Sequence, residues 1–152
     1  MEFVVNDHIA VSPDALFKHL NDTDLLEQMI RRGGATVRRT DAGRGAGVGA
    51  TWQIGAPFRD RTLDVTMTVT EVEAPHRMRV LFTTGGVEGK VVLLATPAGD
   101  GTDTAFTMTM GASTLIGRLL LQSLKLARGQ ISSRVHKRVG NYLHRAEERA
   151  GV

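Results

Sequence analysis

The residues that could do chemistry in this sequence are few, and their spacing argues against most catalytic and metal sites. Five histidines occur, but none lies in a metal-binding spacing such as HExxH, and there is no cysteine to bind zinc or act as a nucleophile. No GxSxG motif marks a nucleophilic serine. Two pairs of carboxylates, Asp22/Asp24 and Glu147/Glu148, are typical of helix ends rather than of an acid–base dyad. The sequence therefore shows no catalytic motif, and it predicts neither a metal site nor a cofactor.

A glycine-rich segment, GRGAGVGA at residues 43–50, nominally matches a nucleotide-binding motif. Gly45, Gly47 and Ala50 have the GxGxxA spacing of a dinucleotide site. That site needs a helix after the glycines, because the pyrophosphate binds at the helix N-terminus. Residues 51–54 instead have the pattern of a strand. The segment is better interpreted as a flexible hairpin turn, with a mobile loop at the mouth of a pocket as the alternative.

Soft apolar side chains on the inward faces of the expected strands are the first candidates for ligand binding. Thioethers and aromatic rings suit an apolar ligand. Methionine is also a general filler of hydrophobic cores, so a plain core stays the alternative. The candidate lining residues on strands are Trp52, Ile54, Val65, Met67, Val80, Phe82, Met108 and Met110.

Polar residues on an apolar helix face are the finer clue. Ser123 falls within the apolar arc of the expected C-terminal helix, next to Leu119, and Gln130 and Arg134 lie close to the same line. An unsatisfied buried polar group costs roughly 1–3 kcal/mol, so each needs a partner. These three polar residues are candidates to meet the polar end of a ligand, with Leu119 beside them. The alternative is that Ser123 bonds to its own helix carbonyl and the other two lie at a wet rim.

The elements that must position these residues follow from periodicity and caps. Residues 2–11 alternate as a strand, and Ser12 and Asp22 are typical N-caps for helices over 13–20 and 23–31. Six further strands are expected at residues 35–40, 51–55, 60–73, 77–83, 87–96 and 102–110. Ser113 is the expected cap of one long amphipathic helix that runs to the C-terminus. Hairpin-length connections make the sheet antiparallel, and a helix packed on one face of it gives the α+β class.

Composition is that of one globular domain over residues 1–152. Hydrophobic content of 41% and charged content of 23% are ordinary for a soluble protein. The N-terminus lacks the basic region of a secretory signal, and no apolar run is long enough to cross a membrane. Together with the absence of cysteine, these features favour a cytoplasmic location.

The formal charge of +3 conceals an asymmetry between the two parts of the chain. Residues 113–152 hold 8 Lys and Arg against 2 Glu, whereas residues 1–112 hold 11 Lys and Arg against 14 Asp and Glu. The basic residues of the expected helix are Arg118, Lys125, Arg128, Arg134, Lys137, Arg138, Arg145 and Arg149. Either they form a solvated helix face, or they contact an anionic partner such as a membrane surface. Nucleic acid is not favoured, because the helix carries a single aromatic residue and no stacking platform.

Four segments make the chain resemble the START-like, helix-grip superfamily (SRPBCC), which includes polyketide cyclase/dehydrase and lipid-transport proteins. They are the first strand running into VSPDALFKHLND, the GVGATW strand after the glycine turn, the EVEAPHRM turn, and PAGDGTDTAF before the last strand. A C-terminal helix then closes the chain. The resemblance implies a seven-stranded antiparallel sheet gripping the long helix around a deep hydrophobic pocket.

This resemblance indicates the fold more specifically than it indicates the function. Members bind lipids, sterols, polyketides or quinones, and some are aromatase/cyclases that use polar pocket residues. Here Tyr142 and Trp52 are the only Tyr and Trp, so a cyclase set is not visible. The favoured hypothesis is a protein that binds or carries a hydrophobic small molecule. The alternative is an aromatase/cyclase-type enzyme acting on a polyketide-like substrate in the same pocket.

Overall fold

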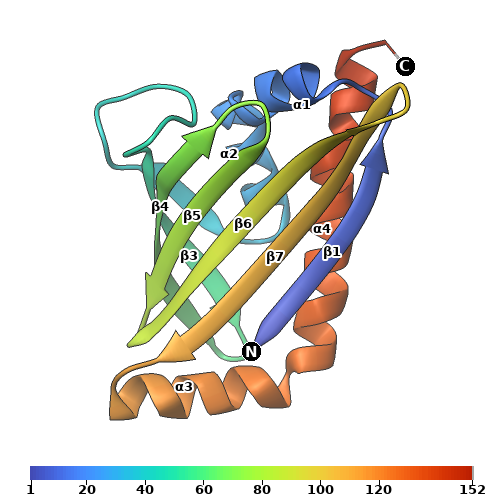
Figure 1. The fold of residues 1–152 in the computed structure, drawn as a ribbon. Coiled ribbons are helices and arrows are strands. Elements are labelled where there is room, and N and C mark those ends of the chain that lie inside the picture. The colour runs from blue at the N-terminus through green and yellow to red at the C-terminus, as the bar shows by residue number, and fades with distance from the viewer. Residues whose placement is uncertain (152) are drawn as a thin grey trace.

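A computed structural model describes residues 1–151, and its elements follow the expected order of a strand, two helices, six strands and a helical C-terminal segment. The strands are β1 (Glu2–Ile9), β2 (Thr36–Arg39), β3 (Thr51–Phe58), β4 (Arg61–Glu73), β5 (Arg77–Thr84), β6 (Val87–Ala98) and β7 (Gly101–Ala112). The helices are α1 (Pro13–Leu20), α2 (Thr23–Arg32), α3 (Leu115–Leu126) and α4 (Arg128–Arg149). Figure 1 shows α4 beside β1, with α3 across one end of the sheet.

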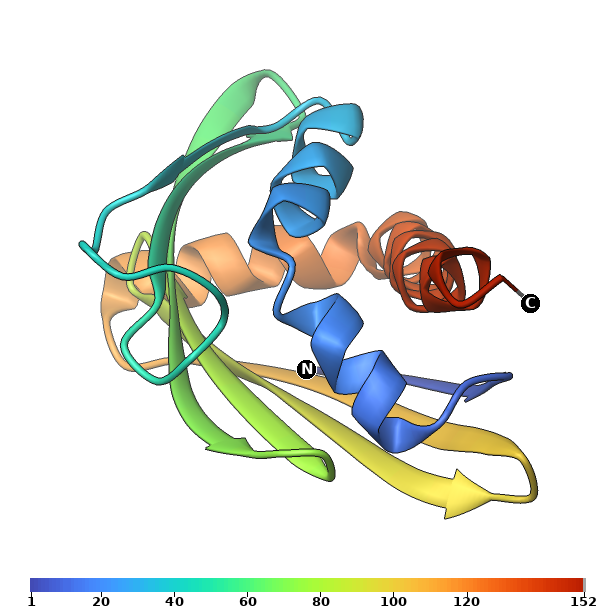
Figure 2. The ribbon, with the colours of Figure 1, turned by 90° about the horizontal axis from the view of Figure 1, so that it is seen from above.

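All seven strands form one antiparallel sheet in the order β1-β7-β6-β5-β4-β3-β2. The sheet curls, and Figure 2 shows α1, α2 and α4 within its concave side. This arrangement confirms the α+β helix-grip fold and its seven-stranded sheet. None of the described helices has both the length and the hydropathy needed to cross a bilayer.

The two short helices begin at the residues that the sequence predicts. The Ser12 hydroxyl accepts the Ala15 N–H at 3.2 Å, and the Asp22 carboxylate accepts the Leu25 N–H at 3.4 Å. Each bond satisfies one of the free N–H groups of a first helical turn. These local caps explain why α1 and α2 start where they do without reference to the rest of the fold.

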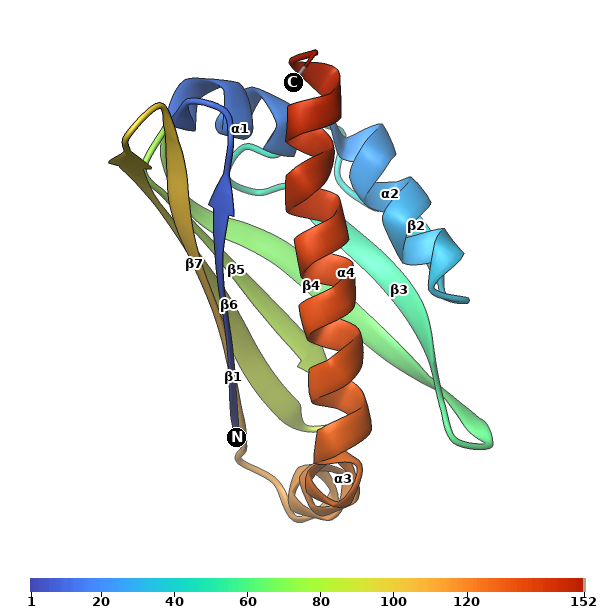
Figure 3. The same ribbon diagram turned by 90° about the vertical axis from the view of Figure 1, so that its right-hand side faces the viewer.

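The C-terminal segment differs from the expected single helix. Thr114, not Ser113, is the N-cap, and its hydroxyl accepts the Gly117 N–H at 3.0 Å. The helix breaks at Ala127, where φ is −96° and ψ is 14°, so α3 and α4 point in different directions. Figure 3 shows α3 end-on below α4. Neither glycine nor proline stands at position 127, and Gly129, two residues further on, weakens a helix without fixing where it breaks.

Packing at the end of the sheet accounts for this break. Leu120, Leu121 and Leu124 of α3 are buried with Leu63 and Val87 of the sheet. Gly117 allows the approach, since a β-carbon there would lie only 2.2 Å from the carbonyl oxygen of Gly86. A straight helix continuing from α4 could not also lay these leucines across the strand ends. Burial of the three leucines therefore outweighs the continuity of the helix.

The core divides into three clusters rather than one. At one end of the sheet α1 and the C-terminal part of α4 bury Leu16, Phe17 and Leu143. At the other end lies the α3 cluster, and a third cluster forms around Trp52 near β2 and α2. We call the first region the α1 end and the second the α3 end.

Candidate functional site

A groove of about 780 Å³ opens at the α3 end, between the β3–β4 hairpin, the C-terminus of α2 and the junction of α3 with α4. Three segments far apart in sequence meet there because the sheet curls and the helix breaks at Ala127. Its lining residues are Gly33, Pro57, Phe58, Arg59, Leu126, Ala127, Gly129, Gln130, Ile131, Arg134 and Arg138.

Apolar walls of the groove come from the hairpin and the helix junction. Phe58 and Ile131 both pack against the buried cluster of the α3 end, and so do Val65 and Met110 of the concave face. The groove wall is therefore continuous with two of the predicted lining residues. Leu126 supplies a further apolar group at the rim and is 79% exposed.

Three guanidinium groups line the groove with no carboxylate among the lining residues. Arg134 and Arg138 lie four residues apart, so they share one face of α4. Arg59 comes from the hairpin, where its φ of +58° is the left-handed conformation that few non-glycine residues adopt. Its Nη2 lies 3.5 Å from the Ser123 carbonyl oxygen, and its guanidinium carbon lies 5.2 Å from the Phe58 ring centre.

Gly33 leaves room for one of these arginines. A β-carbon at position 33 would lie 2.9 Å from Nη1 of Arg138 and 3.3 Å from the Ile30 carbonyl oxygen. The first distance is well inside ordinary van der Waals contact. The absence of a side chain at Gly33 therefore lets the Arg138 guanidinium lie against the end of α2.

Of the predicted polar residues, the structure brings Gln130 and Arg134 into the groove and leaves Ser123 outside its lining. The Ser123 hydroxyl donates to the Leu119 carbonyl oxygen at 3.4 Å, as the alternative interpretation had it. Leu119 itself is 64% exposed on the outer side of α3, away from the buried leucines. The break at Ala127 therefore separates Ser123 and Leu119, which lie on α3, from Gln130 and Arg134, which lie on α4. A single straight helix would place them close to one line.

The predicted strand residues all lie on the concave face, where the register places them side by side. Trp52 is opposite Met67, Met67 is opposite Phe82, and Val80 is opposite Val69. Trp52 is fully buried, and the guanidinium carbon of Arg39 lies over its ring at 4.7 Å from the ring centre. The others are half-buried and do not line the groove, namely Ile54, Val65, Met67, Val80, Phe82, Met108 and Met110. Their role as ligand contacts stays a prediction.

Sequence reasoning did not select Arg59, Phe58 or Arg138 for this site. Arg138 carried a usable signal, since it continues the four-residue spacing from Gln130 through Arg134. Arg59 and Phe58 carried none, because they reach the groove only through the pairing of β3 with β4.

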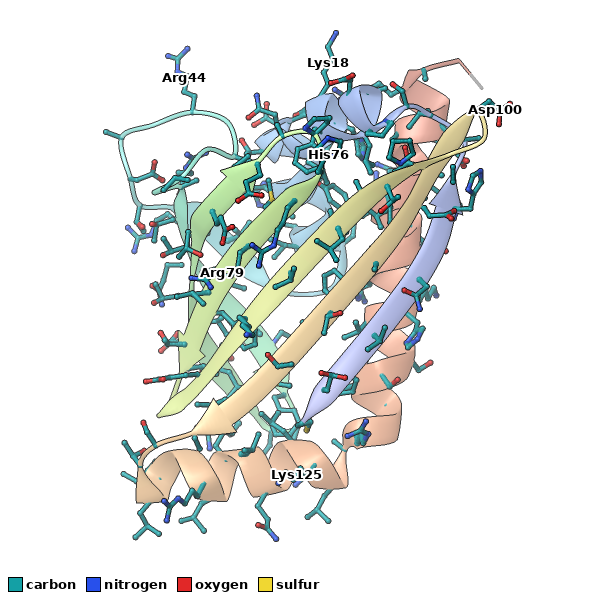
Figure 4. The ribbon with its side chains drawn as sticks, viewed as in Figure 1. Lys18, Arg44, His76, Arg79, Asp100 and Lys125 are labelled. Atoms are coloured by element: carbon teal, nitrogen blue, oxygen red, sulfur yellow. The ribbon has the colours of Figure 1, made fainter. Side chains whose placement is uncertain are left out.

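The glycine-rich segment lies at the α1 end, far from this groove. The Asp41 carboxylate holds it by accepting the Thr51 N–H at 2.9 Å and the Gly43 N–H at 3.0 Å, while pairing with Arg39. The hydrogen bond from Arg39, followed by the one from Thr51, holds the pKa of Asp41 well below its usual range. Figure 4 shows Arg44 of this loop pointing away from the molecule, whereas Lys125 marks α3 at the other end. Strand β3 follows the loop, so the helix of a dinucleotide site is absent there.

The fold defines a class, that of helix-grip proteins with an opening between sheet and C-terminal helix. Residues 1–142 match the family described as "Polyketide cyclase / dehydrase and lipid transport", and the chain belongs to that family. A comparison with curated proteins gives no match.

Solved structures similar to this chain share its fold at low identity. TTHA0849 from Thermus thermophilus is 16% identical with a TM-score of 0.72, over 97% of this chain and 98% of that one. Mll3558 from Rhizobium loti is 14% identical with a TM-score of 0.65, over 96% of both chains. The di-domain ARO/CYC StfQ from the steffimycin biosynthetic pathway is 14% identical with a TM-score of 0.73. That match covers 99% of this chain and 52% of StfQ.

Proposed function

We propose that this protein binds or carries a hydrophobic small molecule that has an anionic end. The family description, which includes lipid transport, supports a hydrophobic ligand. The observation that carries the anionic end is the set of three arginines in a groove lined by no carboxylate. The ligand's charged group would lie between Arg59, Arg134 and Arg138, and its apolar part against Phe58 and Ile131.

Electrostatics favour a carboxylate or phosphate over a neutral polar group. A guanidinium presents several N–H donors in a planar fork that matches two oxygens of such an anion. Three like charges around one groove also repel each other, and a bound anion relieves that repulsion. Gln130 adds a neutral amide that can donate to the same group or accept from a protonated one.

Apolar burial would supply most of the affinity. Each square ångström of apolar surface removed from water contributes about 25 cal/mol. The walls at Phe58 and Ile131 adjoin Val65 and Met110, and the half-buried side chains of the concave face lie beyond them. An alkyl or polyketide-like chain that enters at the groove would meet this continuous apolar surface.

A pair of probes with the same chain and different head groups tests the proposal. Dodecanoate and dodecanol would be titrated into the protein by calorimetry, or by displacement of an environment-sensitive dye. We expect dodecanoate to bind at least about tenfold more tightly, which corresponds to roughly 1.4 kcal/mol. Equal affinities for the acid and the alcohol would contradict the anionic end.

Arginine variants locate the head group. Arg134→Gln with Arg138→Gln should remove most of the preference for dodecanoate and leave dodecanol binding nearly unchanged. Lys137→Gln is the matched control, because Lys137 is an exposed cation of the same helix that does not line the groove. An effect of the control equal to that of the double variant would mean that net charge, not the groove, selects the anion.

Cyclisation of a polyketide-like substrate is the second candidate, favoured by the family description and by the fold shared with the ARO/CYC protein. The polar groups that line the groove are arginines and one glutamine. An arginine stays protonated at neutral pH and orients an enolate better than it removes a proton. Conversion of a linear poly-β-ketone thioester into an aromatic product, followed by absorbance, would distinguish the enzyme from the carrier.

A further inference from the structure

The outer face of α3 is the most apolar exposed surface among the described residues. Leu115 is 73% exposed, Ile116 74%, and Leu126 79%. Together with Leu119, these residues place four large aliphatic side chains in water on one helix of 12 residues. Isolated exposed leucines are ordinary, whereas a contiguous apolar patch marks an interaction surface.

Helical geometry shows that these four side chains share one face. At about 100° per residue, positions 115, 116, 119 and 126 fall within an arc of roughly 100°. Leu120, Leu121 and Leu124, which are buried against the sheet, lie on the opposite side. Helix α3 is therefore apolar on two faces, and the fold covers only one of them.

Positive charge flanks the uncovered face. Arg118 and Lys125 are exposed next to it, and α3 contains no acidic residue. No carboxylate of the described chain pairs with either cation. Acidic residues at this end of the molecule include Glu2 at the start of β1, Asp60 in the β3–β4 turn and Glu88 near the start of β6, and none of them pairs with Arg118 or Lys125. An apolar face with a basic flank is the pattern of a helix that lies in a membrane interface.

We propose that α3 docks this protein onto the surface of an anionic phospholipid bilayer. The outer leucines and Ile116 would enter the boundary between head groups and acyl chains, with Arg118 and Lys125 at the level of the phosphates. Figures 1 and 3 show α3 as the outermost element of its end, which suits a flat surface. A second copy of the chain fits less well, because a stable dimer buries about 800 Å² per partner and one short helix face offers less.

The structure also separates the basic residues that the sequence grouped on one helix. Arg118 and Lys125 lie on α3, whereas Arg145 and Arg149 lie near the other end of α4, a helix of 22 residues and so about 30 Å long. Arg149 pairs with Asp22 at the α1 end. One flat membrane cannot contact both groups, so the docking surface is α3 and not the whole basic segment.

Sedimentation with vesicles tests this docking, and it does not rest on the proposed ligand. Vesicles would contain equal parts of phosphatidylserine and phosphatidylcholine, or phosphatidylcholine alone, at low and at physiological salt. We expect the protein to sediment with the anionic vesicles at low salt and much less at physiological salt, because salt screens the attraction between the basic residues and the negatively charged surface. A protein that stays in the supernatant with anionic vesicles at low salt would overturn the proposal.

Two double variants separate the apolar and the electrostatic contributions. Ile116→Ser with Leu119→Ser should weaken binding at least about tenfold at both salt concentrations, since the lost apolar burial is insensitive to salt. Arg118→Gln with Lys125→Gln should weaken it roughly fivefold per charge at low salt and flatten the salt dependence. None of the four residues substituted in these two variants lines the groove, so dodecanoate binding should be unchanged in both.

Matched controls use exposed aliphatic residues elsewhere. Val48→Ser, 68% exposed in the glycine-rich loop, should leave vesicle binding as in the wild type. Thermal melts establish that each variant is folded. If the wild type is a dimer in solution and the Ile116/Leu119 double variant is a monomer, a second copy covers α3 and the membrane proposal is wrong.

Discussion

At each end of this molecule a pair of helices packs on the sheet, but the two ends differ in how completely these helices are buried. At the α1 end Leu16 and Leu143 are almost fully buried between α1, α4 and the strands. At the α3 end the helix buries one face and leaves Leu126 and Ile116 in water. One end is closed and the other is open, although the helices of both ends bury leucine side chains.

Polar groups show the same contrast. At the α1 end the Glu147 carboxylate accepts the Ala10 N–H at 2.7 Å, and His144 Nδ1 donates to it at 2.8 Å. His19 donates from Nε2 to the Tyr142 carbonyl oxygen at 2.8 Å. At the α3 end the guanidinium groups of Arg134 and Arg138 pair with no carboxylate of the described chain. Glu147 and His144 are therefore partnered within the chain, whereas Arg134 and Arg138 have no ion pair among the described residues.

The largest expected effect is on the free energy of unfolding. Leu143→Ala removes a side chain that is 2% exposed and should lower that free energy by about 2–5 kcal/mol, from lost burial plus a cavity. Leu126→Ala at the open end should change it by less than about 0.5 kcal/mol. Urea unfolding followed by circular dichroism measures both. Similar losses for the two variants would mean that the ends do not differ in packing.

A smaller effect is expected on ligand binding from Gly33→Ala. The new β-carbon would lie 2.9 Å from Nη1 of Arg138 and should displace that guanidinium from the groove. Dodecanoate affinity should fall several-fold, up to about tenfold or 1.4 kcal/mol. Gly47→Ala is the matched control, since a β-carbon there meets nothing within 4 Å. Unchanged affinity in Gly33→Ala would place Arg138 outside the binding site.

The N-caps of α1 and α3 allow a matched comparison of the two ends, because each is a hydroxyl group that accepts one backbone N–H. Ser12→Ala at α1 and Thr114→Ala at α3 each remove one hydrogen bond to a first-turn N–H. Each should lower the free energy of unfolding by about 1 kcal/mol. A loss from Thr114→Ala near zero would show that α3 unfolds locally before the rest of the chain.

The smallest effect is a pH dependence at the closed end. The hydrogen bond to Glu147 raises the pKa of His144 above its usual value of 6.5. Protonated His144 therefore stabilises the fold below about pH 6.5, and this contribution disappears as the pH rises through the higher folded-state pKa. The hydrogen bond from Ala10, and then the one from His144, lower the pKa of Glu147, so its contribution is lost only as the pH falls through that lowered value.

His144→Gln should accordingly destabilise the protein more at pH 6 than at pH 9. The difference should stay below about 1 kcal/mol, because the His144 side chain is 43% exposed and water screens the pair. Melting curves at the two pH values would reveal the contrast, and equal losses at both would contradict the role of the ion pair.

Local signals in the sequence account for most of the fold. Period-two alternation, together with the turn residues between segments, located the seven strands, and Ser12 and Asp22 marked the two short helices. These patterns depend on neighbours a few residues away. The family resemblance supplied the helix grip. The same reasoning placed Ser113 at the start of one long helix and did not locate the break at Ala127, since the nearby Gly129 only lowers helix propensity.

The sequence by itself determined the elements, their order and which strand faces are apolar. Only the tertiary structure decided that α3 turns across the sheet, because burying Leu120, Leu121 and Leu124 there depends on strands more than twenty residues away. That turn brings Arg59 of the hairpin to the helix junction, beside Arg134. Ile116 and Leu119 are exposed on the outer side of α3, although Leu119 was expected on the apolar face of a single long helix. Both proposed binding surfaces therefore depend on the direction of α3, which is set by contacts between residues that are distant in the sequence.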